Sequence, residues 1–443
     1  MSILKERIEV EQGGLVFLSS AFVFRMGLAS MTFDQIRPGG ILVADYFFVL
    51  SFLLLMCGKD RRMLKSRGSG VLAAGAIILC GAALSGVNLA TIQVIALFGL
   101  FAPLGLVHSR NMRENLIFLM GGVVISCTAA IVAAVAWPGI ADVLTIDPKW
   151  PTSAYEFGER YGGLAGHPMS LGLSAALAVL IGVGLLLSKE NAPIRWVLLV
   201  QISLCVIGAL LSGSRNFLAS LVPALFVLAV WRPLSRRAVA AISCGVIFLI
   251  VSWIATNYVA PDLVGAYAER LSKTSADDNE NSGRLLTAAI AVSEISQKPI
   301  LGWGMDHFGE AGMMYLPQDG EYMSAHVNFL QYWYAMGILG AIGFALLFFL
   351  PVRRMLQILK RNPPNGLEEL LKLGISVYLL LFIGSNVQPI LLNRYFYMPL
   401  FLFAGLTMNM VISSRASLSV GRIAQRTPAP RFTAVLADAG TNK

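Results

Sequence analysis

Long apolar runs divide this chain and restrict it to folds that cross a membrane. The runs are 15 to 23 residues long, and most of them reach the length that a helix needs to span the hydrocarbon core. The runs lie at residues 14–33, 41–57, 70–87, 89–107, 115–137, 169–187, 196–214, 217–231, 238–258, 328–350, 371–391 and 395–414. With 56% hydrophobic and 13% charged residues, the composition excludes a soluble globular domain. We therefore predict an all-α polytopic membrane protein with about twelve transmembrane helices, which form a single domain over residues 1–414.

The basic residues predict the orientation of these helices. An even number of spans puts both termini on one side, and that side holds 24 of the 34 Lys and Arg residues. Short cytoplasmic loops retain Lys and Arg, so both termini are predicted to be cytoplasmic. The net charge of +9 then reflects topology and anionic lipid headgroups, with no reason to expect nucleic acid as a partner. Residues 415–443 lack hydrophobic periodicity and predict a disordered cytoplasmic tail.

Two loops on the outer side are long enough to hold structure, at residues 138–168 and 259–327. In the longer loop, Asn281 and Ser282 predict the start of a helix, and Pro299 predicts its end. We expect this helix to lie against the membrane or against the other helices, so the large outer loop is predicted to be partly helical.

The cysteines show no sign of a metal site or of a disulfide framework. All five fall within predicted spans, without paired spacing. They are Cys57, Cys80, Cys127, Cys205 and Cys244. We interpret them as small core residues, and we predict neither a bound metal nor a cofactor.

Polar residues are costly to keep beside a membrane span, and His326 directly precedes one. Ser324 is predicted to cap the helix that begins there, which places the imidazole at the positive end of the helix dipole. That position favours the neutral ring. A neutral imidazole can act as a general base, because it can accept a proton from an attacking hydroxyl group. The alternative is a structural histidine that only ties the loop to the end of the helix.

Two arginines are candidates for binding an anion. Arg284 is predicted in the first turn of its helix, where the helix dipole disfavours a cation unless an anion is present. Free backbone N–H groups, the dipole and a guanidinium together suit a phosphate or a diphosphate. Arg215 follows a short turn rich in Gly and Ser, which would hold its guanidinium at a defined depth. The alternatives are an Arg284 that contacts only solvent and an Arg215 that extends to the lipid headgroups.

The long outer loop contains two further features. Gly302 and Gly304 flank Trp303, and they allow a tight turn or a close approach of another backbone. His307 follows them, and for this residue we favour a structural role as a hydrogen-bond partner over a catalytic role.

Four polar or glycine-rich stretches follow one another in a defined order along the chain. They are residues 160–168 with Arg160 and His167, residues 212–215 ending in Arg215, Arg284 with residues 298–304, and residues 326–340 with His326, Asn328, Gly337 and Gly340. In this order and spacing they resemble the O-antigen ligase and polymerase-like family of bacterial envelope glycan transferases. The resemblance covers residues 155–350, and the first 150 residues match only in hydropathy. Val327 stands where many members have Asn directly after the histidine.

The resemblance implies a metal-independent transferase of the GT-C type, which acts at the outer, periplasmic face of the bacterial inner membrane. Its donor would be a glycan on undecaprenyl diphosphate, and its acceptor a lipid A-core sugar or a second lipid-linked glycan. Arg215 and Arg284 would hold the donor diphosphate, while His326 would activate or orient the acceptor hydroxyl, with inversion at the anomeric carbon. The substrate-binding candidates are Arg160, His167, Gly302, Gly304, His307 and Asn328.

Several functions fit this outline. A ligase would transfer the finished glycan to lipid A-core, and a polymerase would transfer it to another lipid-linked repeat unit; we favour the ligase. A transporter or lipid flippase would carry mid-membrane charges and structural repeats, and no internal repeat is evident. A peptidoglycan glycosyltransferase of the shape-and-division type would use the same carrier lipid, and the acidic residues Asp277, Asp278 and Glu280 keep this alternative open.

Overall fold

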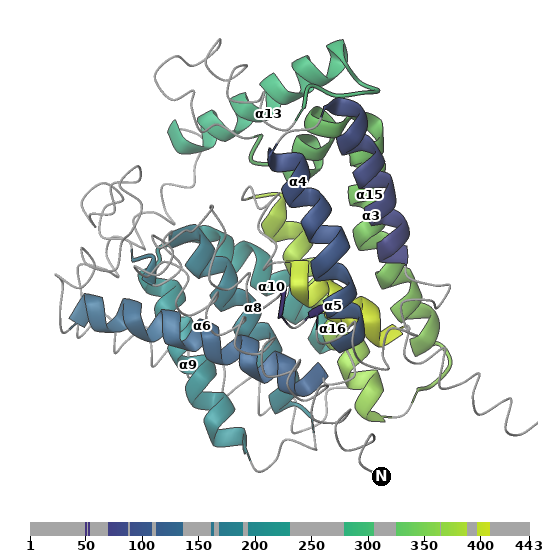
Figure 1. Ribbon diagram of the computed structural model, residues 1–443. Helices are drawn as coiled ribbons and strands as arrows, with labels where there is room; N and C mark the ends of the chain where they lie inside the picture. The colour runs from purple at the N-terminus through teal and green to yellow at the C-terminus, as the bar shows by residue number, and fades with distance from the viewer. Residues whose placement is uncertain are drawn as a thin grey trace, which may run out of the picture.

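The regular structure of this protein is helical wherever the computed structural model describes it (Figure 1). The structure describes residues 49–50, 52–53, 70–86, 89–108, 112–135, 161–163, 168–188, 194–230, 279–304, 325–363, 365–387 and 397–407. No strand occurs among these residues, as the sequence predicts.

The helices follow the predicted apolar runs closely. They are α3 (Gly70–Ser85), α4 (Leu89–Ala96), η4 (Leu97–Phe101), α5 (Ala102–His108), α6 (Met112–Val135), α8 (Pro168–Leu186), α9 (Arg195–Leu211), α10 (Arg215–Val230), α13 (Asn279–Gln297), α15 (Asn328–Leu359) and α16 (Asn365–Ser385). A last helix spans Tyr397–Thr407. The predicted spans at 14–33 and 238–258, most of the span at 41–57 and the tail at 415–443 lie outside the described residues.

Three of the described helices are long and apolar enough to cross a membrane, namely Met112–Val132, Pro168–Leu186 and Asn328–Leu359. Shorter apolar helices span Val71–Ser85, Arg195–Leu211, Asn216–Val230 and Tyr397–Thr407. Helices of this kind fit a membrane protein. The total of about twelve spans and the GT-C likeness stay predictions.

α3 and α15 run side by side, and small residues let them approach closely (Figure 1). A methyl group built on Gly81 would lie 3.0 Å from the carbonyl oxygen of Met336, and one built on Gly343 would overlap the side chain of Ile78. Close backbone approach through small residues is a common way for helices to associate in a membrane, where dispersion contacts supply much of the attraction.

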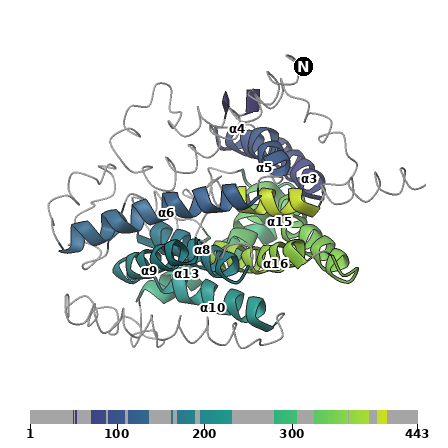
Figure 2. The ribbon, with the colours of Figure 1, turned by 90° about the horizontal axis from the view of Figure 1, so that it is seen from below.

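α8 is the central helix of a second group. Most of its residues are buried, and it packs against α6, α9, α10 and α16, which surround it in Figure 2. A helix that is apolar on all sides requires neighbours on all sides, and α8 has them. Gly184 brings α8 close to α16, because a methyl group there would lie 2.6 Å from Leu373.

The motif stretches gather at one end of this bundle, which we call the motif end. Here α8, α10 and α15 begin, and α9 and α16 end. A methyl group on Gly172 would lie 2.5 Å from the Cβ of Ser214, so the first turn of α8 touches the turn before α10. α16 reaches the same place, since a methyl group on Gly384 would overlap Leu173.

α15 is interrupted at Gly337, which has a φ of 64° and a ψ of −160°. This backbone conformation is essentially restricted to glycine. The interruption means that some backbone groups of α15 need partners outside the helix. Such groups are costly to leave unpaired in a membrane protein, where water does not replace the lost hydrogen bond.

Residues 298–304, which we call the Trp303 loop, supply two of these partners. The backbone N–H of Trp303 donates to the carbonyl oxygen of Tyr334 at 2.8 Å, and the N–H of Gly304 donates to that of Ala335 at 3.0 Å. The loop therefore replaces donors that an unbroken helix would provide from its next turn.

α15 also donates a hydrogen bond to the loop, because the N–H of Ile338 donates to the carbonyl oxygen of Ile300 at 3.3 Å. Glycine is required on both sides of this contact. A methyl group on Gly302 would lie 2.5 Å from the backbone nitrogen of Gly337, and one on Gly337 would overlap the Ile300 carbonyl. Gly302 and Gly304 also have positive φ values of 75° and 96°. The close backbone approach predicted for these glycines is confirmed.

A pair of buried tyrosines joins α15 to the last helix. The hydroxyls of Tyr332 and Tyr397 lie 3.1 Å apart, and both residues are almost completely buried. Tyr378 of α16 adds a second link to this helix, because its hydroxyl donates to the carbonyl oxygen of Leu400 at 2.7 Å.

α13 lies across the motif end, at the top of Figure 1, and it contacts α15. It ends at Gln297, as predicted, because the proline two residues later cannot continue a helix. The predicted start at Asn281 and Ser282 is wrong, since the helix already begins at Asn279.

Replacing Gly337 with Ala is expected to destabilise the protein by about 3 kcal/mol or more, because the methyl group meets the Ile300 carbonyl and the backbone conformation is strained for any other residue. Thermal unfolding of the detergent-solubilised protein measures this effect. Gly121→Ala in α6 is the matched control, since a methyl group there meets nothing within 4 Å. Similar melting temperatures for the two variants would contradict the structural role of Gly337.

Candidate active site

His326 lies in a strained turn directly before α15. Its φ is 53°, in the left-handed region that a residue with a Cβ adopts at a cost of about 1–3 kcal/mol. The residue is half-buried, and it follows the fully buried Ala325. Strain of this kind persists only where the surrounding contacts hold the backbone in place.

Two side chains, one in α15 and one directly after α16, hold this turn. The Oε1 atom of Gln331 accepts a hydrogen bond from the backbone N–H of Ala325 at 2.9 Å. The Oδ1 atom of Asn386 accepts one from the N–H of Phe329, in the first turn of α15, at 3.3 Å. The Asn386 amide in turn donates to the carbonyl oxygen of Phe382 at 2.8 Å, which fixes its orientation.

Sequence reasoning missed Gln331 and Asn386 as supports of the histidine turn. A signal was present, because each is a polar side chain within a predicted apolar span, and such residues usually have a specific partner. The cap predicted for this helix is also wrong. The N-cap residue is Val327, which makes no side-chain cap, and Ser324 lies outside the described residues. His326 nevertheless precedes the positive end of the α15 dipole, as predicted.

Asn328 is the first residue of α15 and is completely buried. It therefore lies within the protein beside the histidine turn. A contact between Asn328 and a substrate stays a prediction.

The Trp303 loop fastens α13 to α15 through side chains as well. The indole N–H of Trp303 donates to the carbonyl oxygen of Glu294 in α13 at 2.9 Å. The Lys298 ammonium lies 3.7 Å from the centre of the Trp303 ring, in a cation–π contact. From the other side, the indole N–H of Trp333 donates to the carbonyl oxygen of Pro299 at 3.1 Å. In the described contacts, Gly302 and Gly304 serve this packing, and their binding of substrate stays a prediction.

The buried face of α13 carries both apolar residues and one charged residue. Ile290, Ala291 and Ile295 are buried, together with Glu294, which is only 8% exposed. Leu286, nearer the start of α13, is 42% exposed. The buried glutamate accepts a hydrogen bond from the Gln297 amide at 3.4 Å.

The two candidate arginines are placed by their backbones alone. Arg215 is the first residue of α10 and follows a turn in which Gly213 has a φ of 56°. Arg284 lies in the second turn of α13, rather than in the first turn as predicted, because the helix begins at Asn279. The side chains of both arginines lie outside the described residues, and so do Arg160, His167 and His307.

The first motif stretch reaches the bundle through its described residues, Tyr161 and Gly163. The N–H of Tyr161 donates to the carbonyl oxygen of Leu211, at the end of α9, at 3.1 Å. A methyl group on Gly163 would lie 2.5 Å from the carbonyl oxygen of Ser126 in α6. This stretch therefore packs between α6 and α9, next to the turn that precedes Arg215.

The motif end thus brings together parts of all four motif stretches. The turn before Arg215 touches α8, α8 touches the end of α16, and Asn386 after α16 bonds to the residues after His326. The Trp303 loop joins from the other side of α15.

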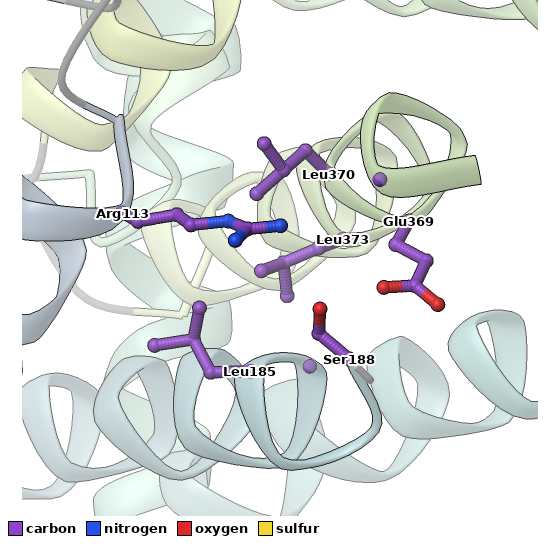
Figure 3. Close-up of a pocket in the computed structure, with 8 residues that line it drawn as sticks. Arg113, Leu185, Ser188, Glu369, Leu370 and Leu373 are labelled. Carbon is purple, nitrogen blue, oxygen red and sulfur yellow. The ribbon is translucent and has the colours of Figure 1, made fainter. Parts of the chain in front are cut away.

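A cavity of about 10 Å³ lies at the opposite end of the bundle, where α6 and α16 begin (Figure 3). Arg113 extends into it between α8 and α16, and Ser188 and Glu369 line it with Gly184, Leu185, Gly366, Leu370 and Leu373. A cavity of this size holds about one water molecule. It is remote from the motif end and has no part in the candidate site.

The described cysteines take no part in the site either. Cys127 and Cys205 are buried between α6 and α9, as predicted, whereas Cys80 is exposed on α3 and is not a core residue. Among the described residues, no cluster of three or more His, Cys, Asp or Glu side chains could hold a metal ion.

The long apolar helices among the described residues fit a membrane protein. Residues 200–345 match the family model described as O-antigen ligase. This match confirms the resemblance to the O-antigen ligase and polymerase-like family, and it supports glycan transfer of that general type. The matched residues include Arg215, Arg284, the Trp303 loop and His326, and they end eight residues after Gly337. No curated protein matches this chain.

Replacing His326 with Gly is expected to give a protein more stable than the Ala variant by about 1 kcal/mol, because glycine accepts the left-handed backbone without strain. Both variants lose the same imidazole, so the comparison isolates the backbone. Thermal unfolding of the purified variants checks this. Asn362, with a φ of 49° and an exposed side chain, provides the matched Gly and Ala pair outside the site. Equal stability of the two His326 variants, alongside a difference at Asn362, would contradict strain at the histidine.

Proposed function

We propose that this protein is a membrane glycosyltransferase, which moves a glycan from undecaprenyl diphosphate to a sugar hydroxyl, and that it acts as an O-antigen ligase with lipid A-core as acceptor. One observation carries the proposal: the matched family region contains a strained histidine turn at a helix N-terminus, held by hydrogen bonds from two helices. A residue held in an unfavourable conformation by its surroundings is typical of a functional position.

The donor diphosphate would be bound by Arg215 and Arg284. Both residues lie in the matched region, and Arg215 begins a helix, where backbone N–H groups and the dipole favour a phosphate. Guanidinium groups form paired hydrogen bonds with phosphate oxygens. They would also stabilise the charge that develops on the leaving diphosphate as the bond to the anomeric carbon breaks.

His326 would act on the acceptor. The dipole of α15 favours a neutral imidazole, which can accept the proton of the acceptor hydroxyl as its oxygen attacks the anomeric carbon. Attack opposite the leaving diphosphate inverts the configuration at that carbon. The carrier diphosphate already activates the sugar, so we propose that the reaction needs neither a nucleotide nor a metal.

The location follows from the charges of the chain. Most Lys and Arg residues fall on the side that we assign to both termini, which would be cytoplasmic. The motif end would then face the periplasm of a bacterial inner membrane, where lipid-linked glycans are presented.

A polymerase that uses the same donor is the second candidate, because the matched family description supports both kinds of transfer in general terms. The two differ in the glycans that accumulate when the protein is deleted. Full-length glycan left on the carrier lipid would support the ligase, and single repeat units would support the polymerase. Normal glycan on every carrier would contradict both.

Replacing Arg284 or His326 with Ala is expected to lower glycan transfer at least about 100-fold, because each variant loses a group that acts in the transition state. Transfer is measured with purified protein and lipid-linked glycan, at matched amounts of inserted protein. Arg353→Ala, at an exposed position near the opposite end of α15, is the control and should retain activity. Near-normal transfer by both site variants would remove the proposed active site.

A metal chelator is expected to leave the rate of transfer unchanged, because the proposed mechanism relies on guanidinium and imidazole groups alone. The rate is compared with and without chelator on the same preparation. Inhibition that added divalent cations reverse would show that the metal-free mechanism is wrong.

A further inference from the structure

The turn that leads into α10 buries polar side-chain atoms that have no hydrogen-bond partner among the described residues. Asn216 is only 4% exposed, and within the described part of the chain neither its Oδ1 nor its Nδ2 atom makes a hydrogen bond. Ser214, two residues earlier, is 1% exposed, and its hydroxyl is likewise without a partner there. A primary amide and a hydroxyl thus lie together at the motif end, on either side of Arg215.

Buried polar side chains are rarely left without a hydrogen bond. A buried donor or acceptor without a hydrogen bond loses its hydration and gains nothing in return, and most buried polar side chains in proteins do have a partner. Several backbone groups around them do have partners. The Ser214 N–H bonds to the Ser212 hydroxyl at 3.2 Å, and the carbonyl oxygen of Asn216 accepts from Ser220 at 2.6 Å. The missing partners are therefore specific to the two side chains.

Helix geometry directs the Asn216 side chain toward the motif end. Asn216 is the second residue of a 16-residue helix, and side chains in a helix tilt toward its N-terminus. The same end carries the positive pole of the helix dipole. On one side the turn is closed off by α8, because Gly172 lies against Ser214 with no room for a methyl group between them.

The Asn216 amide has both a donor and an acceptor, and this restricts which chemical groups can be its partner. A diphosphate oxygen only accepts hydrogen bonds, so it would satisfy Nδ2 and leave Oδ1 unpaired. A sugar hydroxyl both donates and accepts, and two neighbouring hydroxyls or one amide substituent of a sugar would satisfy both atoms of Asn216. The orphan acceptor therefore favours a sugar over the diphosphate.

We propose that Asn216, assisted by Ser214, binds the sugar that the donor diphosphate carries, directly beside the arginine that would bind the diphosphate itself. This inference rests on the proposed function. The turn of residues 212–216 would then bind two parts of the donor. Arg215 would bind the carrier diphosphate, and Asn216 would bind the glycan.

The test compares stability with donor affinity in Asn216→Leu. Leucine removes an amide that has no hydrogen-bond partner among the described residues, so the melting temperature should stay the same or rise. The KM for the lipid-linked glycan should rise about tenfold with little change in kcat, because the lost contact is made in the bound state and in the transition state alike. A structural amide would instead lower the melting temperature.

Two probes separate the possible partners. Inhibition by undecaprenyl diphosphate, which carries no sugar, should be as strong in Asn216→Leu as in the unaltered protein. Weaker inhibition would show that Asn216 binds the diphosphate, and an unchanged KM for the glycan donor would show that it binds no donor; either result overturns the proposal. Asn216→Ala, which adds no atoms, replaces the leucine variant if that protein does not accumulate.

Ser376→Ala in α16 is the matched control. Ser376 is completely buried, and its hydroxyl also has no partner among the described residues, but it lies within the helix and away from the motif end. It should retain the KM of the unaltered protein. The proposed function has a separate outcome, because an unaltered protein that transfers no glycan from the carrier lipid would contradict that function whatever the Asn216 variants do.

Discussion

The architecture of the motif end depends on how α15 satisfies its backbone where the helix is interrupted. Gly337 breaks the hydrogen-bond ladder, and the Trp303 loop restores it with two N–H donors and one carbonyl acceptor. A membrane protein cannot leave such groups to water in its apolar interior. The loop is therefore held as firmly as a turn of helix would be, although it is far from α15 in the sequence.

This exchange ties together segments that the proposed chemistry needs to be near one another. α13 carries Arg284 and leads into the Trp303 loop. This loop forms hydrogen bonds with α15 around Gly337, after the histidine turn in the sequence. The turn itself is held by Gln331 of α15, and Asn386, directly after α16, holds the first turn of α15 that follows it. These contacts maintain a left-handed His326 that local preferences alone would not favour.

Local rules predicted much of this fold. The lengths of the apolar runs correctly predicted most of the described helices, and Pro299 correctly predicted the end of α13. Glycines around Trp303 correctly indicated a close backbone approach. The sequence did not reveal the interruption of α15, because a single glycine in an apolar run is common and its partner lies more than thirty residues away. The Ser324 cap failed for a similar reason, since the first turn of α15 bonds instead to Asn386, a contact that depends on tertiary packing. For the candidate site, the sequence correctly placed His326 before a helix, while the roles of the arginines stay predictions.

The paired hydroxyls of Tyr332 and Tyr397 bear on how much of the chain is needed to form the histidine turn. Tyr397 lies well beyond residue 345, where the family match ends, yet it is the partner of a fully buried tyrosine six residues after His326. A fragment cut at the edge of the match would lose this hydrogen bond together with the helix that carries Tyr397, at a cost of about 1 kcal/mol for the hydrogen bond alone. The minimal folding unit of this end of the protein therefore extends through its last described helix.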